Sequence, residues 1–371
     1  MKLGFRKDDL LEAVNIVSRA VPSRTTNNIL ECILFDASAG SIVLMASNTE
    51  LSISTKVEGE IMERGKAAVN AGLITEIIRK CENPDSQIVI DMDPNTSYTI
   101  TVEADGAVFR FPGRDGDEFP YPEYVEKDRY ISISHFTLKE AVRQTAFSAA
   151  VNDNNKMMGG ALVEVDGTSL KFTTLDGHRV AIRKIEMKDD YGAFSSIIPV
   201  KALNEVSKII SSDNDKEVVI YFTDNYVSFE WDETTVITRV IDGEFFRIAH
   251  MIKSDYDTKV DINKNRLVGA IDRAMIFVKE SEHKPIVLTL EDEYMYLRMR
   301  SSLGEMNGEV ECEKLGRDLK IAFNPKYILD VLRVLDDENV TLYFTNAKEP
   351  CFIRDEAESY IYMILPVNFI E

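Results

Sequence analysis

Long apolar runs are missing from this sequence of 371 residues. No stretch approaches the roughly 18–20 apolar residues that a helix needs to cross a membrane. The first residues, Met1-Lys2-Leu3-Gly4-Phe5-Arg6, also lack the apolar core of a secretory signal. We therefore expect a cytoplasmic protein without a membrane partner.

Cysteine and histidine are scarce, with four residues of each. The cysteines show neither a CxxC pair nor metal-ligand spacing: Cys32, Cys81, Cys312 and Cys351. We interpret them as buried thiols in a reducing compartment. The histidines are equally scattered: His135, His178, His250 and His283. With P-loop and GxGxxG motifs absent as well, the sequence predicts no metal site and no cofactor.

Basic residues are outnumbered, with 43 Lys and Arg against 63 Asp and Glu and a formal net charge of −20 at pH 7. An acidic surface repels phosphate, which argues against a protein that binds nucleic acid over its whole surface. A local basic face remains compatible with this sum, so the distribution of charge matters more than the total.

The sequence does contain an internal repeat with a period of about 125–130 residues. Each copy opens with a short expected strand, at residues 2–5, 130–133 and 259–262. A helix pattern follows in each copy, and Leu10, Leu138 and Leu267 hold the same place in it, 128 and 129 residues apart. The apolar residues of these three helices recur at helical spacing: Leu10, Leu11, Val14 and Val17; Leu138, Ala141 and Val142; Leu267, Val268, Ile271 and Met275.

The second half of each copy repeats this order. A strand, expected at residues 67–69, 196–198 and 319–323, leads into a second amphipathic helix and then into strands that alternate apolar and polar residues. We therefore expect an α+β fold of three domains, each with two helices packed on antiparallel sheets. A polar, proline-marked segment at 120–129 and a polar segment at 253–258 place the domains at 1–125, 126–253 and 254–371.

The six expected helices differ in charge from the rest of the chain. Together they carry a net charge of +3, so the remainder carries −23. This contrast indicates an acidic outer surface and a helix-lined surface that tolerates anions. A simpler alternative is that Lys and Arg are common in helices because of their helix propensity.

Four short motifs stand in order along the repeat: Thr173-Thr174-Leu175-Asp176-Gly177-His178-Arg179, Asp242-Gly243-Glu244-Phe245, Phe323-Asn324-Pro325-Lys326-Tyr327 and Met363-Ile364-Leu365-Pro366-Val367. With the threefold repeat, they closely resemble the bacterial DNA sliding clamp family, the β subunit of DNA polymerase III, over the whole chain. The resemblance implies a head-to-tail homodimer that forms a closed ring of six domains. Such a ring is a processivity factor: it encircles double-stranded DNA, slides without sequence specificity and tethers the replicative polymerase.

The resemblance also implies a peptide-binding pocket between domains 2 and 3. Its partners would be short linear motifs of the replicative polymerase, the clamp loader and repair or translesion factors. Carried over by position, the pocket residues are Met158, Leu175, Gly177, His178, Arg179, Val180, Phe246, His250, Met251, Asn324, Tyr327, Lys348, Pro350, Met363, Ile364, Leu365, Pro366 and Val367. The alternative for Met157, Met158 and residues 363–365 is ordinary core. Phe246, Lys348 and the tail beyond Val367, which includes Phe369, depart from the family pattern and leave the peptide preference open.

Two further sets of residues follow from the resemblance. The residues expected to face DNA are Arg24, Arg79, Lys80, Arg143, Asn152, Lys201, Lys208, Arg273 and Lys326. The residues expected at the dimer interface are Phe109, Phe111, Ile276 and Phe277. The alternatives are solvated surface charges for the first set and burial within the domains for the second.

Two other functions compete with the clamp as explanations of the sequence. An enzyme would have to use Asp176 and His178, the single Asp-x-His grouping, but no Ser or Cys nucleophile motif accompanies them. An Asp-Gly pair between strands is more often a turn, so we expect no catalytic site. A three-domain scaffold that binds peptides without encircling DNA differs from the clamp in being a monomer.

Overall fold

A computed structural model describes the chain except for residues 84–85, 94–97, 152–154, 279–283 and 370–371. Its described residues form two compact units. The first unit contains Met1–Phe136 and Glu205–Val240, and the second contains Thr137–Asn204 and Ile241–Glu371.

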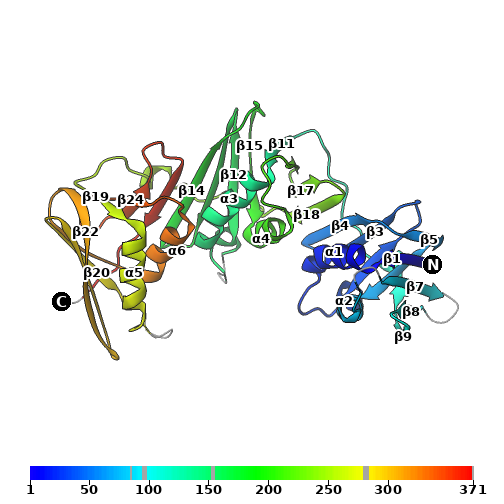
Figure 1. The fold of residues 1–371 in the computed structure, drawn as a ribbon. Coiled ribbons are helices and arrows are strands. Elements are labelled where there is room, and N and C mark those ends of the chain that lie inside the picture. Colours follow the sequence, from blue (N-terminus) through cyan, green and yellow to red (C-terminus); the bar gives the residue numbers. More distant parts are fainter. Residues whose placement is uncertain (84–85, 94–97, 152–154, 279–283, 370–371) are drawn as a thin grey trace. The chain divides into compact units, whose positions relative to one another are not determined.

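Each of the three copies has the expected order of a strand, a helix and further strands, twice over (Figure 1). The first copy consists of β1 (Lys2–Arg6), α1 (Lys7–Val17), β2 (Cys32–Asp36), β3 (Ile42–Ser47), β4 (Leu51–Val57), β5 (Glu60–Glu63), β6 (Lys66–Asn70), α2 (Ala71–Lys80), β7 (Gln87–Asp93), β8 (Thr99–Ala104), β9 (Ala107–Pro112) and β10 (Arg114–Asp115). The second consists of β11 (Tyr130–Ser134), α3 (His135–Thr145), β12 (Gly160–Asp166), β13 (Ser169–Leu175), β14 (Arg179–Glu186), β15 (Ala193–Pro199), α4 (Val200–Ile209), β16 (Glu217–Phe222), β17 (Tyr226–Trp231) and β18 (Thr234–Arg239). The third consists of β19 (Thr258–Asn263), α5 (Lys264–Met275), β20 (Ile286–Glu291), β21 (Tyr294–Ser301), β22 (Gly304–Gly316), β23 (Leu319–Phe323), α6 (Pro325–Val334), β24 (Asn339–Phe344), β25 (Cys351–Arg354) and β26 (Tyr360–Ile364). The expected α+β fold with antiparallel sheets is confirmed.

The two halves of each copy are interlocked by strand exchange. The first strand of each half pairs with the strands of the other half: β1 with β7, β6 with β2, β11 with β16, β15 with β12, β19 with β24 and β23 with β20. All of these pairs are antiparallel. Neither half of a copy therefore completes its sheet without the other.

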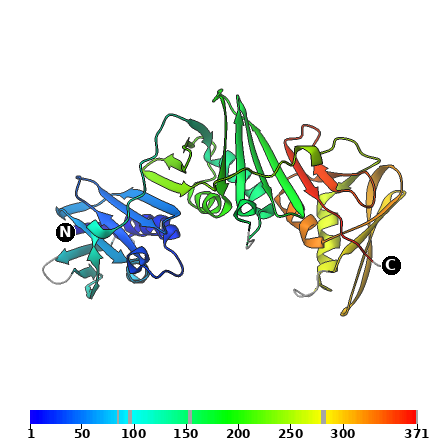
Figure 2. The same ribbon diagram turned by 180° about the vertical axis from the view of Figure 1, so that it is seen from behind.

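The helices bury the apolar faces that their spacing predicts. Leu10, Val14 and Val17 of α1 are buried, and Leu11 is half-buried. In the third copy α5 and α6 lie side by side against the strands, as Figures 1 and 2 both show. Three helices begin at an asparagine whose side-chain oxygen accepts a backbone N–H of the first turn, which stabilises the helix start: Asn70, Asn263 and Asn324.

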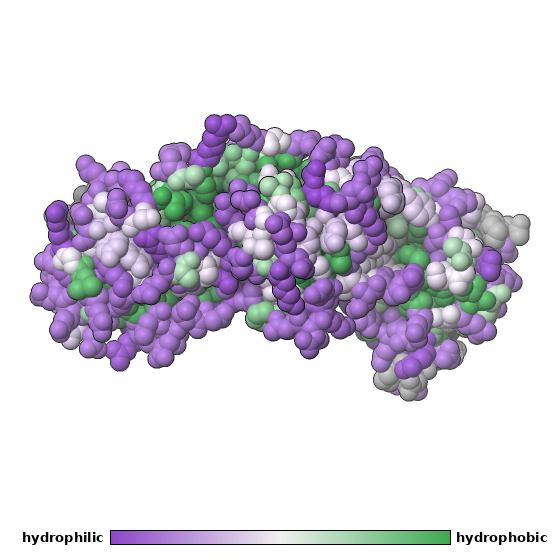
Figure 3. All heavy atoms as spheres, turned by 90° about the horizontal axis from the view of Figure 1, so that it is seen from above, coloured by the Kyte–Doolittle hydropathy of each residue, from purple (hydrophilic) through white to green (hydrophobic). Residues whose placement is uncertain are grey.

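The outer layer is polar, in keeping with the 29% of charged residues. Hydrophilic side chains cover most of the face shown in Figure 3, with smaller apolar areas between them. In the described part of the chain, no helix has the length and apolar character for a membrane span. All four cysteines are buried, as expected, and burial raises the pKa of the Cys32 thiol to about 11.

Candidate functional site

The turn between β13 and β14 is shaped by Asp176. Its Oδ1 accepts hydrogen bonds from the backbone N–H groups of His178 and Arg179, at 3.0 and 3.1 Å. Gly177 has a φ of 83°, a conformation that glycine adopts without strain. The carboxylate therefore binds the backbone of the turn and the Arg179 guanidinium, as a structural group does.

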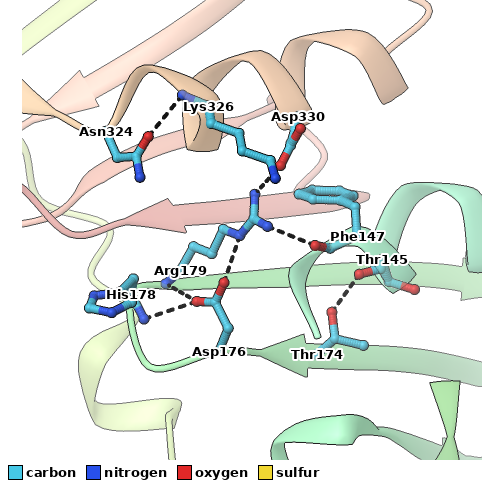
Figure 4. Close-up of polar contacts among 9 residues, drawn as sticks. All are labelled: Thr145, Phe147, Thr174, Asp176, His178, Arg179, Asn324, Lys326 and Asp330. Atoms are coloured by element: carbon cyan, nitrogen blue, oxygen red, sulfur yellow. Dashed lines mark hydrogen bonds and ion pairs between the residues drawn. The ribbon is translucent and has the colours of Figure 1, made fainter. Parts of the chain in front are cut away.

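Arg179 is the centre of a buried network in the second unit (Figure 4). Its Nε donates to Asp176 Oδ2 at 2.9 Å, its Nη1 to Asp330 Oδ2 at 2.7 Å and its Nη2 to the Phe147 carbonyl at 2.8 Å. The guanidinium also lies over two rings, 5.2 Å from the centroid of Phe147 and 4.6 Å from that of Tyr327. The side chain thus joins β14 of the second copy to α6 of the third.

His178 lies on the exposed side of the same network. Its ring stacks on Tyr327, with centroids 5.9 Å apart and planes at 22°. Its carbonyl accepts a hydrogen bond from the N–H of Leu365 at 2.9 Å. His178 therefore contacts Tyr327 through its exposed ring and Leu365, which directly follows β26, through its backbone.

Next to this network, β14 pairs with β26, and Val180 stands opposite Met363. The two strands share one apolar cluster with residues from both copies. Its buried members are Leu175, Val180, Ile182, Ile197, Phe245, Tyr343, Phe352, Ile361 and Met363, and its half-buried members include Met157, Met158, Ile248, Met251 and Leu365. We call this set the methionine cluster. Partly exposed methionines on an apolar floor form a surface that adapts to different apolar side chains.

The other expected pocket residues differ in their surroundings. Phe246 is 36% exposed, with its ring edge-on to Phe245, and His250 and Lys348 are exposed. Asn324 caps α6, while Pro350 and Pro366 are half-buried. Val367 is exposed, and its N–H donates to the Ala322 carbonyl at 2.8 Å.

Four of the expected apolar pocket residues are buried in this structure: Leu175, Val180, Met363 and Ile364. Met363 is 2% exposed and Ile364 is fully buried in the core of the third copy. Phe369 lies under the ammonium group of Lys320, which is 5.6 Å from its ring centroid. The tail therefore follows β23 rather than covering the methionine cluster with its aromatic ring.

The residues expected to face DNA fall into two groups. Arg143 forms ion pairs with Glu140 and Asp336, Lys208 pairs with Glu205 at 2.6 Å, and Arg79 donates to Asn15. The others are exposed and have no ion pair with any described residue: Arg24, Lys80, Lys201, Arg273 and Lys326. Asn152 lies outside the described residues.

The residues expected at the dimer interface are only partly covered. Phe109 is 37% exposed and Phe111 is half-buried, both on the edge strand β9. Ile276 is 72% exposed directly after α5. Phe277 is half-buried against the core of the third copy.

Comparison with known proteins matches the whole chain to one family. Residues 1–123, 132–246 and 250–368 match the N-terminal, central and C-terminal domains of the DNA polymerase III beta subunit. A solved structure from Eubacterium rectale, described as a putative DNA polymerase III beta subunit, is 50% identical, with 100% of both chains covered and a TM-score of 0.95. The DNA polymerase sliding clamp of Bacillus subtilis is 29% identical, again with 100% of both chains covered and a TM-score of 0.94. The beta sliding clamp of Staphylococcus epidermidis is 28% identical over 379 residues, which cover 99% of each chain.

The chain belongs to the DNA polymerase III beta subunit family. The function of that family, a processivity clamp in DNA replication, is therefore the function of this chain. Sliding clamps act by holding a polymerase on DNA rather than by catalysis, and membership implies DNA and polymerase as partners.

Several contributors to the site were not found from the sequence, among them Asp330, the Phe147 carbonyl and Phe245. Asp330 shares a face of α6 with Tyr327, three residues earlier, and this spacing was a usable signal. The Phe147 carbonyl and the buried Phe245 could not be found in this way. A backbone acceptor leaves no trace in the residue type, and the burial of Phe245 depends on strands distant in sequence.

Proposed function

We propose that two copies of this chain close head to tail into a ring around double-stranded DNA. The ring slides without reading sequence, and short linear motifs of the replicative polymerase, clamp loader and repair factors bind at the methionine cluster. The observation that carries the proposal is the threefold repeat, matched to the family from one end of the chain to the other. The domain boundaries 1–125, 126–253 and 254–371 and the absence of catalytic activity belong to the same proposal.

An open strand edge beside apolar side chains supports one side of the dimer interface. Residues 304–311 of β22 pair with β21, and no strand of the described chain pairs with their other edge. The Phe277 ring lies directly against Gly304 of this strand. One ring carbon is only 2.8 Å from the position that a Cβ atom at Gly304 would occupy. The exposed Ile276 side chain stands next to Phe277 in the sequence, so an open edge and an apolar patch occur together.

The first copy offers a matching surface at β9. This strand lies at the edge of the five-stranded sheet β5-β1-β7-β8-β9 and pairs only with β8 among the described strands. Phe109 and Phe111 stand opposite the buried residues Val102 and Ile100, so they share the core-facing side of the sheet. They nevertheless remain partly exposed, and Val108 on the other face is 50% exposed.

Open strand edges with apolar neighbours favour pairing with another chain. Because the two surfaces differ, pairing β9 of one copy with β22 of another makes a head-to-tail contact. Such a contact forms a ring when its rotation closes and a filament when it does not. We propose closure after two copies.

The contact with DNA rests on weak, collective electrostatics. Among the residues expected to face DNA, five are exposed and form no ion pair with a described residue: Arg24, Lys80, Lys201, Arg273 and Lys326. Phosphate contacts from such side chains are independent of sequence and weaken as salt rises. Ring closure then supplies retention, while the acidic remainder of the surface discourages binding elsewhere.

The mass of the protein in solution separates the ring from a monomeric scaffold. Two chains of 42.0 kDa each give a particle of about 84 kDa at micromolar concentration. Analytical ultracentrifugation measures this mass directly. A single species at the mass of one chain would support the scaffold and contradict the ring.

Replacing Leu365 by Gln should weaken binding of a polymerase-derived peptide by about tenfold or more. Leu365 is a half-buried member of the methionine cluster, so the peptide would lose an apolar contact with it. Fluorescence polarisation with a labelled peptide measures the affinity. Leu365 suits the test better than Met363, whose buried side chain also stabilises the fold. Leu315→Gln is the matched control, because Leu315 is 65% exposed and outside the cluster. Unchanged affinity in the Leu365 variant would place the peptide site elsewhere.

A further inference from the structure

The segment that leads from the second copy into the third is fixed to the third copy. Residues 252–257, which we call the connector, belong to neither a helix nor a strand. The Lys253 ammonium nevertheless pairs with Glu349 at 2.8 Å. At the other end, the N–H of Asp257 donates to the Phe344 carbonyl at 2.9 Å. The connector is therefore not a free tether between the copies.

Arg354 of β25 holds the middle of the connector. Its Nη1 donates to the Lys253 carbonyl at 3.3 Å, and its Nη2 donates to the Ser254 carbonyl at 2.9 Å. The residue is only 7% exposed, and Glu358, 3.1 Å away, balances its charge. A planar guanidinium presents several N–H donors in a fixed geometry, so it can bind two neighbouring carbonyls at once. An almost buried arginine thus fixes the backbone of an exposed segment.

Tyr343 of β24 connects this anchor to the methionine cluster, of which it is a buried member. The Arg354 guanidinium lies over its ring, 4.7 Å from the centroid. Tyr256 of the connector also packs against Tyr343, with ring centroids 5.0 Å apart. One ring therefore borders the anchor, the connector and the peptide site.

Two half-buried residues of the methionine cluster, Met251 and Ile252, directly precede the anchored carbonyls. Because a single peptide bond joins Ile252 to Lys253, fixing the Lys253 carbonyl limits the positions that both side chains can take. A site whose residues are already in place binds its ligand without the entropic cost of ordering them.

We propose that Arg354 is a positioning residue of the peptide site: it fixes the chain that carries Met251 and Ile252 without contacting the peptide. The inference rests on the proposed peptide site and adds the residue that keeps one side of it in place. Without this anchor the connector takes other positions, and only a fraction of the molecules present the complete site. The apparent affinity then falls by that fraction.

Replacing Arg354 by Ala should weaken binding of the labelled polymerase-derived peptide by about tenfold. Stopped-flow fluorescence should show slower association, because few molecules have the complete site, with dissociation at the wild-type rate. Leu365→Gln, which removes a contact, should instead mainly speed dissociation. Arg183→Ala is the matched control and should bind as the wild type does. Arg183 also donates to the third copy, but to Ser359 at 2.7 Å, outside the connector.

Guanidinium ion separates positioning from a general effect on folding. At millimolar concentration it should restore much of the affinity of Arg354→Ala along a saturable curve, since it can occupy the space between the two carbonyls and the Tyr343 ring. Potassium chloride at the same ionic strength should restore none. Tyr256→Ala removes a second anchor through a side chain that is 47% exposed, so the core stays intact. It should slow peptide association by about threefold.

Hydrogen exchange tests the anchor without any peptide. In Arg354→Ala the amides of residues 250–257 should exchange faster than in the wild type, while those of α6 and β26 keep their rates. Faster exchange throughout the second unit, with a loss of affinity that guanidinium does not restore, would overturn the proposal. A loss carried by faster dissociation would overturn it as well.

The two claims about the site fail in different ways. Wild-type affinity in Arg354→Ala, together with a loss in Leu365→Gln, would overturn the positioning role and leave the peptide site standing. Wild-type affinity in Leu365→Gln would contradict the peptide site itself.

Discussion

Replacing Ile276 by Asp should convert the dimer into monomers at concentrations at which the wild-type protein is expected to be fully dimeric. Ile276 is 72% exposed in the isolated chain, next to Phe277 and near the open edge of β22. A carboxylate at this position would have to be buried without a partner when the interface forms. The cost is on the order of 3 kcal/mol, about a hundredfold in the dissociation constant. Sedimentation velocity over a dilution series measures this shift.

Ile276 is a sharper choice than Phe277 for this test, since Phe277 also packs on the core of its own domain. Loss of the dimer on changing Phe277 would mix a folding effect with an interface effect. Leu315→Asp is the control, because Leu315 is a comparably exposed aliphatic residue at the far end of β22. An Ile276→Asp variant that keeps the wild-type dissociation constant would contradict the proposed interface.

The second large effect is expected from Arg179→Ala. The substitution removes the shared partner of Asp176 and Asp330 and the donor to the Phe147 carbonyl. Breaking a buried ion pair by deleting one partner costs about 3–5 kcal/mol, because the remaining charges stay desolvated. The midpoint of thermal unfolding of the second unit should fall by roughly 10 °C. Differential scanning calorimetry measures this midpoint.

Arg247→Ala provides the matched control within the same unit. Arg247 also pairs with a carboxylate three residues away, Glu244, but the two side chains are 83% and 73% exposed. An exposed pair contributes about 0–1 kcal/mol, so its loss should barely move the midpoint. Equal effects of the two substitutions would show that the Arg179 network does not stabilise the unit.

Much of the fold could be predicted because its signals are local. The apolar spacing of Leu10, Val14 and Val17 lies within one helix, and the same spacing recurs in every copy. The exchange of first strands between half-copies could not be predicted, since β1 and β7 pair across about 85 residues and their sequences fit either sheet.

The candidate site shows the same division. Its residues were found by their resemblance to a family. The sequence could not show which of them line the pocket and which are buried in the core. Met363 alternates with its neighbours as any strand residue does, and only the pairing of β26 between β14 and β25 buries it. Arg179 was expected to contact a peptide, whereas three hydrogen bonds within the protein already hold its guanidinium. The dimer interface and the DNA contacts involve other molecules and remain predictions.

Retention on circular DNA tests the central claim most directly. The protein is placed on a nicked circular duplex by a clamp loader, unbound protein is removed, and the amount bound is followed after a restriction enzyme cuts the circle. A closed ring holds DNA by topology, so the protein should stay on the circle and leave from the free ends once it is linear. Equal retention on both forms would show that it binds DNA by direct contact and does not encircle it.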